Sequence, residues 1–356
     1  MAIVSRKRTL ASPMAAYRTV AICVIAGALA LMFTNADAAT IPAKSGWSGY
    51  LLLGATYTDF SSNMVSGTKL GDMSKETIGS LTGSPDSDSG IIPSVNFELA
   101  YTWANSRTQV YAGNALIDML TMDLSTVLGM RQEIGRNGTG YVALVFSGIS
   151  TEVYSDPYVV NSSRDVTDRD SRGFRLGWSE IMGSKWTVEY TQRKIDLDNE
   201  RSGTLGGLGL TPEQQQLLNR EGDQYDALVN YRFKFDKHYL QPQLRYKKQD
   251  YDGRAMSNDG MEFQLAHGYD GERFATVVNV LGGWFDFDAQ NPIPAFGGRT
   301  REDDILGIAF TIFDSKLIPV KGWSVTATLG YFEVDSNIDF YDSEVTLAQA
   351  GVFYRF

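Results

Sequence analysis

Two histidines, His238 and His267, are the only imidazole groups that the chain could use for acid–base or nucleophilic catalysis. An esterase or a protease that works through histidine needs a serine near it and an orienting acid or amide. The segments that flank the two histidines contain no such set. We therefore predict that the chain has no catalytic residues, and a hydrolase is the weakest of the alternatives considered below.

Carboxylates are a second group of residues that could do chemistry, and they form five short clusters. Several oxygen ligands held together could bind Ca²⁺, which could also bridge them to the phosphates of lipopolysaccharide. No cluster has the spacing of a calcium-binding loop with its distant closing glutamate. Solvated loop charge is the better interpretation, so we predict no metal site and no cofactor. The clusters contain Asp86 and Asp88; Asp165, Asp168 and Asp170; Asp196, Asp198 and Glu200; Glu302, Asp303 and Asp304; and Asp339, Asp342 and Glu344.

Basic residues are the third group, and they occur at alternate positions of neighbouring segments. Alternate side chains of an extended strand point to the same face of a sheet, so these residues would share one wall. Glu189 and Asp226 belong to the same face, which leaves the wall with a net excess of four positive charges. A wall of this kind would attract anions. The predicted basic wall consists of Arg175, Arg193, Arg232, Lys234, Arg245 and Lys247.

The segments that carry these residues have apolar side chains at every second position. In the first of them Trp47, Leu51 and Tyr57 fall on one face, and Ser48 and Thr56 fall on the other. A period of two with aromatic residues at both ends of the apolar face is typical of strands that separate lipid from a polar lumen. Further predicted strands cover residues 94–103, 141–150, 174–179, 186–193, 225–235, 240–246, 261–268, 274–284, 305–313 and 323–334, with a less regular pair at 108–116 and 124–132.

The connections between these strands alternate between tight turns and long loops. With the closing strand, the pattern predicts an all-β fold: a transmembrane antiparallel up-and-down β-barrel of about fourteen strands, within a range of 12 to 16. Its basic wall would line the lumen, and its long loops, at 61–90, 152–171, 196–222 and 286–303, would be extracellular. Loops 61–90 and 196–222 are candidates to plug the lumen. Thr211 followed by Pro212 predicts a helix start, with the helix continuing to Arg220.

The N-terminus has the features of an export signal. Four basic residues precede an uncharged run of about fifteen residues, which is too short to span a membrane, and Ala36-Asp37-Ala38 offers a small-x-small cleavage site. We predict a signal peptide at 1–38 that is cleaved after Ala38, a short periplasmic segment at 39–46 and the barrel at 47–356. Removing residues 1–38 takes away a net charge of +3, so the formal charge changes from −10 to −13, which disfavours nucleic-acid binding.

The C-terminus alternates in the same way as the other strands. Val352, Tyr354 and the terminal Phe356 fall on one face. A final strand that ends on an aromatic residue resembles the sorting signal read by the outer-membrane assembly machinery, which we expect to be a partner of the chain. The alternative is the edge strand of a soluble sandwich, but the repeated aromatic pattern favours a barrel closed in lipid, where no strand edge can stay open.

Several segments together resemble an uncharacterised family of exported Gram-negative proteins known as a domain of unknown function, DUF2860. The likeness spans nearly the whole mature chain, and because the family has no established activity it implies no functional residues. The segments are Pro85-Asp86-Ser87-Asp88-Ser89-Gly90, Gln109-Val110-Tyr111-Ala112-Gly113, Asp156-Pro157-Tyr158-Val159, residues 195–203, Gln214-Gln215-Gln216-Leu217-Leu218 and residues 335–342.

The residues themselves favour a porin-like outer-membrane barrel, a passive diffusion channel for small solutes with a preference for anions. A ring of about fourteen strands is wide enough for water if no loop fills it. The alternative is a non-conducting structural or surface-interaction barrel with acidic extracellular loops, its interior filled by ion pairs. Outer-membrane lipid and lipopolysaccharide are expected partners in either case.

Overall fold

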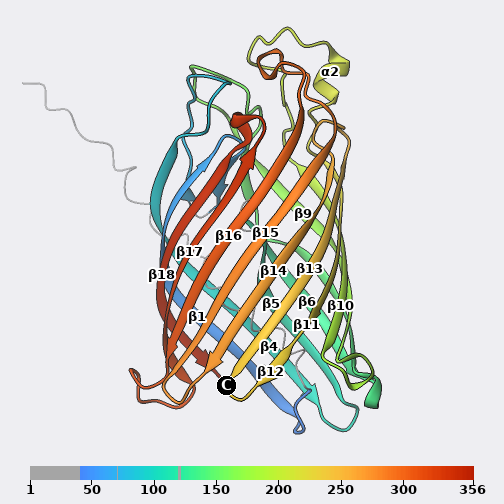
Figure 1. The fold of residues 1–356 in the computed structure, drawn as a ribbon, viewed down its shortest axis with the longest axis vertical. Coiled ribbons are helices and arrows are strands. Elements are labelled where there is room, and N and C mark those ends of the chain that lie inside the picture. The colour runs from blue at the N-terminus through green and yellow to red at the C-terminus, as the bar shows by residue number, and fades with distance from the viewer. Residues whose placement is uncertain (1–40, 70, 119–121) are drawn as a thin grey trace, which may run out of the picture.

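The computed structural model describes residues 41–69, 71–118 and 122–356. The predicted signal peptide, with its cleavage site after Ala38, lies outside these residues. Fourteen antiparallel strands close into a single barrel, which confirms the predicted fold class and strand number (Figure 1). Closure is direct, because the first and the last strand pair from Tyr50 with Arg355 to Ser62 with Ser343.

Two of the fourteen wall strands are interrupted, β7 by Ser150 before β8 and β11 by Arg232 before β12. A hairpin of two short strands, β2 (Val65–Thr68) and β3 (Gly71–Asp72), branches from the wall and pairs with β8. The wall consists of β1 (Gly46–Ser62), β4 (Ser87–Trp103), β5 (Thr108–Asp118), β6 (Asp123–Glu133), β7 (Thr139–Ile149) with β8 (Thr151–Tyr154), β9 (Val166–Ser179), β10 (Trp186–Leu197), β11 (Gly222–Tyr231) with β12 (Phe233–Phe235), β13 (His238–Tyr251), β14 (Asn258–Asp270), β15 (Phe274–Gln290), β16 (Thr300–Asp314), β17 (Trp323–Ser336) and β18 (Ser343–Arg355).

Alternation along each strand separates an outer face from the lumen. On β1, Leu53 and Tyr57 are 42% and 44% exposed, whereas Thr56 between them is fully buried on the lumen side. Apolar side chains outside and polar ones inside are what a wall between lipid and an enclosed lumen requires. The less regular predicted pair forms β5 and β6, which hydrogen-bond to each other along most of their length.

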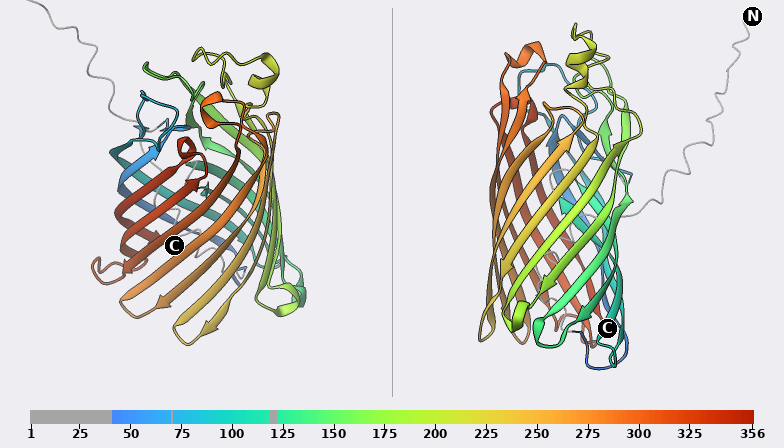
Figure 2. Two further views of the ribbon diagram at one scale, coloured as in Figure 1. Left: turned by 45° about the horizontal axis from the view of Figure 1, so that its top comes forward. Right: turned by 90° about the vertical axis from the view of Figure 1, so that its right-hand side faces the viewer.

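The two ends of the barrel differ (Figures 1 and 2). Tight turns and the C-terminus lie at one end, here named the turn end, and long connections lie at the other, the loop end. In bacterial barrels the short turns face the periplasm and the long loops face the outside. Outward-facing aromatic contacts gather near the turn end, for example between Trp323 and Tyr354 and between Trp186 and Tyr231.

Several predicted boundaries are wrong. The predicted loop at 152–171 shrinks to 155–165, because β8 continues to Tyr154 and β9 begins at Val166. The predicted loop at 286–303 shrinks to 291–299, because β15 and β16 continue their pairing beyond the apolar band to Gln290 and Thr300. The predicted helix forms as α2 (Pro212–Gln216), with Thr211 and Gln214 in a reciprocal capping box, but it ends four residues before Arg220. The side chain of Arg220 is instead held in a buried ion pair, described below. Among the described residues, no helix is long and apolar enough to cross a membrane.

The terminal residue takes part in closing the barrel. Phe356 N donates to Gly49 O at 3.1 Å, Gly49 N donates to Phe356 O at 3.2 Å, and the Phe356 ring stacks on Tyr354. Deleting Phe356 should therefore remove two hydrogen bonds, of about 1 kcal/mol each, at the closing seam and lower the assembled fraction. The measurement is the heat-modifiable gel mobility of outer-membrane fractions. Arg355→Ala, which keeps the backbone, is the control, and normal assembly of the deletion variant would contradict the expectation.

Candidate binding site between the lumen and the loop cap

Six connections at the loop end pack into one body, the loop cap, which comprises residues 63–69 with 71–86, 155–165, 198–221, 252–257, 291–299 and 337–342 (Figures 1 and 2). Its core is aromatic. Tyr158, Phe296, Phe340 and Tyr341 are at most 2% exposed, and Tyr158 and Phe340 stack with ring centroids 5.3 Å apart. Burial of large aromatic side chains stabilises a packed arrangement, so these loops form a small hydrophobic core of their own.

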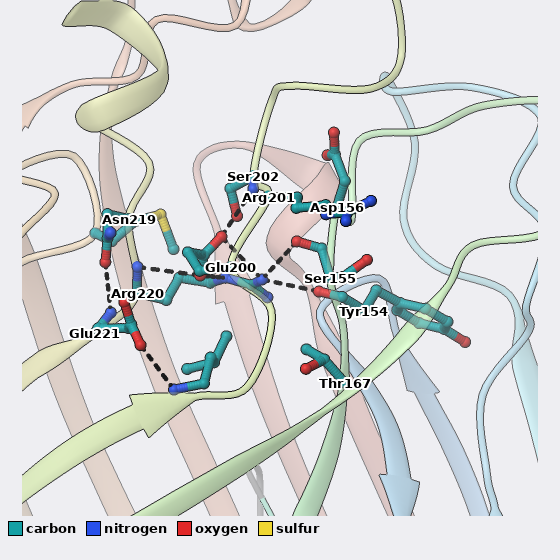
Figure 3. A network of polar contacts seen from close by, with 12 residues as sticks. Tyr154, Ser155, Asp156, Thr167, Glu200, Arg201, Ser202, Asn219, Arg220 and Glu221 are labelled. Atoms are coloured by element: carbon teal, nitrogen blue, oxygen red, sulfur yellow. Dashed lines mark hydrogen bonds and ion pairs between the residues drawn. The ribbon is translucent and has the colours of Figure 1, made fainter. Parts of the chain in front are cut away.

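Arg220 clamps the third long loop to the end of β8 (Figure 3). Its Nε donates to Glu200 Oε2 at 2.8 Å, and its Nη2 donates to the backbone carbonyl oxygens of Tyr154 and Ser155 at 2.8 and 3.1 Å. The side chains of Arg220 and Glu200 are each 8% exposed. Removing one partner of such a pair leaves a buried uncompensated charge, which typically costs about 3–5 kcal/mol.

A buried carboxylate joins the same two loops a second time. Asp156, 1% exposed, accepts hydrogen bonds from the backbone N–H groups of Tyr158 at 3.1 Å, Gly203 at 3.0 Å and Leu205 at 2.7 Å. Backbone donors stabilise an ionised carboxylate that has lost its water. The loop at 155–165 and the loop at 198–221 therefore behave as one unit.

Arg164 ties the first long loop to the second. Its guanidinium lies 3.6 Å above the ring of Tyr154, and it donates to the carbonyl oxygens of Asn63 at 2.8 Å and Glu76 at 3.1 Å, as well as to that of Lys75. Arginine suits this position because its planar group offers five donors in fixed directions. The first loop is held down over the barrel by these contacts.

Two tyrosine hydroxyls meet in the centre of the cap. Tyr158 Oη and Tyr341 Oη are 2.7 Å apart, and Asn291 Nδ2 donates to Tyr341 Oη at 2.6 Å. Burial raises the pKa of Tyr158 well above the usual value of 10.0, and burial also raises the pKa of Tyr341. Both hydroxyls are therefore neutral at physiological pH and can hydrogen-bond to each other without repulsion.

An apolar layer crosses the lumen beneath the cap. It joins Leu124 of β6 and Ile195 of β10 with Phe332 of β17 and Leu347 of β18, which lie on opposite sides of the barrel. Val65 and Met73 of the first loop pack into the same layer. The first predicted plug thus reaches into the barrel, whereas the second, residues 196–222, packs mainly within the cap.

A cavity of about 190 Å³ lies between the apolar layer and the cap. Leu197, Phe285 and Val334 contribute to its apolar lining. Its charged lining is dominated by bases, with four basic side chains and one carboxylate: Arg169, Arg220, Lys247 and Arg301 against Asp303. A small concave site with an apolar body and a few convergent polar groups is the usual form of a ligand site.

Three members of the predicted basic wall lie in ion pairs. Arg175 Nε is 3.1 Å from Glu189 Oε1, and Arg245 Nη1 is 3.1 Å from Glu262 Oε2. Arg193, 1% exposed, pairs with Asp123, which is 2% exposed. These partners offset part of the positive excess of the wall.

The other three members of the wall lie in different surroundings. Lys247 is opposite Asp226 in the β11–β13 register and lines the cavity, the one wall residue to do so. Arg232 Nε donates to Gln241 Oε1 at 2.9 Å and lies over the ring of Tyr239, and Lys234 is exposed near the turn end. The six residues are therefore spread along the wall and are not gathered in one place.

Sequence analysis missed the residues that come from elsewhere in the chain. Glu262 faces Arg245 in register and could have been found from strand alternation, but Asp123 approaches Arg193 from a strand that is not its neighbour. The interpretation of the acidic clusters as solvated is wrong for two members. Glu200 and Asp303 are buried, because Arg220 and Arg301 bring compensating charge and hydrogen bonds to them.

The two histidines lie far from the cavity, on β13 and β14 near the turn end. His238 Nδ1 and His267 Nε2 are 3.2 Å apart, and the His238 ring stacks against Phe235. Their neighbourhood is aromatic and includes Tyr269. No group of three or more residues that could bind a metal ion occurs in the part of the chain that the structure describes.

Comparison with solved structures finds outer-membrane barrels. OmpT of Vibrio cholerae, in its outer-membrane expressed form, is 9% identical, with a TM-score of 0.42 and coverage of 88% of this chain and 99% of that chain. The CymD monoaromatic hydrocarbon channel is 11% identical, with a TM-score of 0.41 and 95% coverage of both chains. An anion-selective porin from Comamonas acidovorans is 8% identical, with a TM-score of 0.40 and coverage of 88% and 100%.

No curated protein matches the chain significantly. The model of one family, described as "Protein of unknown function (DUF2860)", matches residues 46–355, which is the whole barrel. This match agrees with the resemblance seen in the short segments of the sequence. The chain therefore belongs to the DUF2860 family, and its fold is a closed antiparallel β-barrel of fourteen strands.

Proposed function

We propose that the protein is a diffusion channel for small solutes whose loop end is closed at rest and opens when the loop cap moves. The observation that carries the proposal is the cavity between the cap and the apolar layer. A barrel that served only as a scaffold would have no need of a ligand-sized space lined by charged side chains. A solute-specific channel needs a binding site of this kind, because the solute must bind strongly enough to enter and weakly enough to leave.

The polar lining of the lumen on the turn side of the apolar layer supports the proposal. Uncharged polar side chains from many strands pack there with at most 8% exposure, so a path for solutes opens only when they move apart. Polar groups are costly to bury in an apolar interior, so this lining is suited to water or polar solutes. It includes Asn96, Gln109, Asn230, Gln241, Gln264, Asn279, Thr328 and Gln349.

A non-conducting surface-interaction barrel is the second candidate. The dense packing of the loop cap around Tyr158 and Phe340 favours it, since a fully packed cap could remain closed permanently. The two candidates differ in one measurable property, the conductance of the barrel when the cap is loosened.

Loosening the Arg220 clamp should open the channel. Arg220→Ala leaves Glu200 buried without its partner and frees the carbonyl oxygens of Tyr154 and Ser155, so the cap should separate from β8. In planar bilayers we expect a mean conductance several times that of the wild type.

The control for this experiment is Arg273→Ala, which removes an exposed ion pair with Asp314 at the turn end. It should leave the conductance unchanged. If both Arg220→Ala and a deletion of residues 204–216 conduct no better than the wild type, the surface-interaction barrel is the better description.

The open channel should favour anions. The wall carries six basic residues against Glu189, Asp226, Asp123 and Glu262, and charge that lines a narrow path raises the local concentration of counter-ions. Acidic loops oppose this preference. Their effect is weaker, because charges more than about 8 Å from the path are screened at physiological salt.

Selectivity can be measured as the reversal potential of the Arg220→Ala channel across a salt gradient. Adding Arg175→Gln and Arg245→Gln should move the potential toward cation preference, because Glu189 and Glu262 then lose their basic partners. Adding Arg273→Gln, outside the lumen, should have no effect. Cation selectivity of the starting channel would contradict the proposed preference.

Alkaline pH should also open the cap. The folded-state pKa values of Tyr158 and Tyr341 are raised above 10.0, so their contribution to cap stability is complete below pH 10 and is lost as the pH rises through the raised values. Limited proteolysis of the cap should therefore be slow at about pH 8 and fast at about pH 11. The double variant Tyr158→Phe, Tyr341→Phe has no hydroxyl to ionise and should stay protected; equal cleavage of both proteins would show that another group controls the opening.

A further inference from the structure

We propose that the cavity beneath the loop cap binds a small amphipathic carboxylate, an organic monoanion whose apolar part is no larger than a single ring or a short chain. This inference names the solute class of the proposed channel and takes its physiological meaning from that proposal. The binding itself can be measured without any conductance.

The volume of the cavity limits the size of the ligand. An engineered apolar cavity of about 150 Å³ in another protein holds benzene. The cavity here, at about 190 Å³, has room for a ring of that size and a carboxylate beside it. A long-chain fatty acid or an oligosaccharide is larger than this volume.

The apolar part of the lining explains why a purely polar solute would fit poorly. Leu197 and Val334 are buried side chains of the wall, and Met256 comes from the cap, so apolar groups face the space from both sides. An apolar ligand body gains roughly 25 cal/mol for each Å² of surface that it removes from water here. A hydroxylated or multiply charged solute would lose hydrogen bonds to water here, and the apolar side chains could not replace them.

Arg301 is held in place by a carboxylate and two aromatic rings. Its Nε lies 2.8 Å from Asp303 Oδ1, its Nη2 contacts Asp303 Oδ2, and its guanidinium lies over the rings of Phe287 and Tyr341 at 4.4 and 4.0 Å. A cation fixed on three sides loses little freedom when a ligand arrives, which favours affinity. Tyr341 belongs to the cap, so Arg301 connects the cavity with the hydrogen-bonded centre of the cap.

Lys247 of β13 supplies a second basic group, on the same wall as Arg301 of β16. It is 6% exposed, and its Nζ lies 5.7 Å from the centre of the Phe285 ring. A desolvated ammonium next to an aromatic face offers both a charge for a carboxylate and a surface for a ring. The two needs of an amphipathic anion are thus met by neighbouring residues.

Arg193 extends the basic region toward the turn end. Arg169, which lines the cavity, and Arg193 both contact Asp123. The Nε and Nη2 atoms of Arg193 are buried and have no hydrogen-bond partner within the described residues. Buried donors without partners are costly, and an anion that leaves the cavity on this side could satisfy them.

These observations select among classes of ligand. A neutral hydrocarbon would offer no hydrogen-bond acceptor to the N–H groups of these basic side chains, which makes it a weaker ligand than an anion of the same shape. A polyanion would place its additional charges against the apolar lining, where they would lose their hydration at a cost. A monoanionic carboxylate satisfies both parts of the surface.

The test uses the purified full-length barrel in detergent, with benzoate as the probe and isothermal titration as the measurement. Benzoate should bind at least tenfold more tightly than benzyl alcohol, its neutral analogue, and than citrate, which lacks an apolar part. Absence of benzoate binding, or equal affinity for benzoate and benzyl alcohol, would overturn the proposal.

Two variants assign the binding to this cavity. Lys247→Met removes one charge at similar length and should weaken benzoate binding at least tenfold, whereas Lys185→Met, at an exposed ion pair near the turn end, should not. Val334→Phe fills part of the cavity and should abolish binding while leaving all basic groups in place. Heat-modifiable mobility checks that each variant is folded, and unchanged affinity in folded Val334→Phe would refute the site.

The outcome separates this inference from the proposed function. Benzoate binding in a barrel that never conducts, even after Arg220→Ala, would support the proposed binding site and contradict the proposed channel function. Conductance of the Arg220→Ala barrel, without benzoate binding to the wild type, would support the channel function and contradict the proposal that the cavity binds a carboxylate.

Discussion

A backbone that crosses lipid must satisfy all its hydrogen bonds within the protein, because the hydrocarbon core offers no partners. For strands, the only solution is a closed ring, and here the ring closes through the long pairing of β1 with β18. The side-chain pattern follows from this closure, since every strand then has one face toward lipid and one toward the lumen. The charged side chains on the inner face must therefore find partners inside the barrel or remain in water.

The barrel meets that requirement differently along its axis. On the turn side, amides, hydroxyls and ion pairs such as Arg175–Glu189 line the interior. Near the loop end, an apolar layer and the loop cap exclude water, and the charges there, including Arg193 and Arg220, are almost completely buried with carboxylate partners. Low dielectric strengthens these contacts and makes each of them costly to break.

The cap has a hydrophobic core of its own. Tyr158, Phe340 and Tyr341 are almost completely buried against one another, and buried ionic clamps hold the loops to the barrel rim. Such a body can move as a unit when a few contacts are lost, which is a requirement for a gate. The basic cavity lies where the movement of the cap would expose it.

The sequence by itself determined the barrel, its strand number, the two ends, the capping box at Thr211 and the set of basic residues on alternate positions. These features depend on local periodicity and turn chemistry, which each segment carries within itself. Whether that set of basic residues acts as a conducting wall remains a prediction. Only the tertiary structure decided the burial of Glu200 and Asp303, the pairing of Arg193 with Asp123 and the closure of the cap. Tyr158 and Tyr341 are 183 residues apart in the chain, and no local pattern encodes a hydrogen bond between them. Such contacts arise after the ring has closed, because closure alone brings the loops of distant strands over one opening.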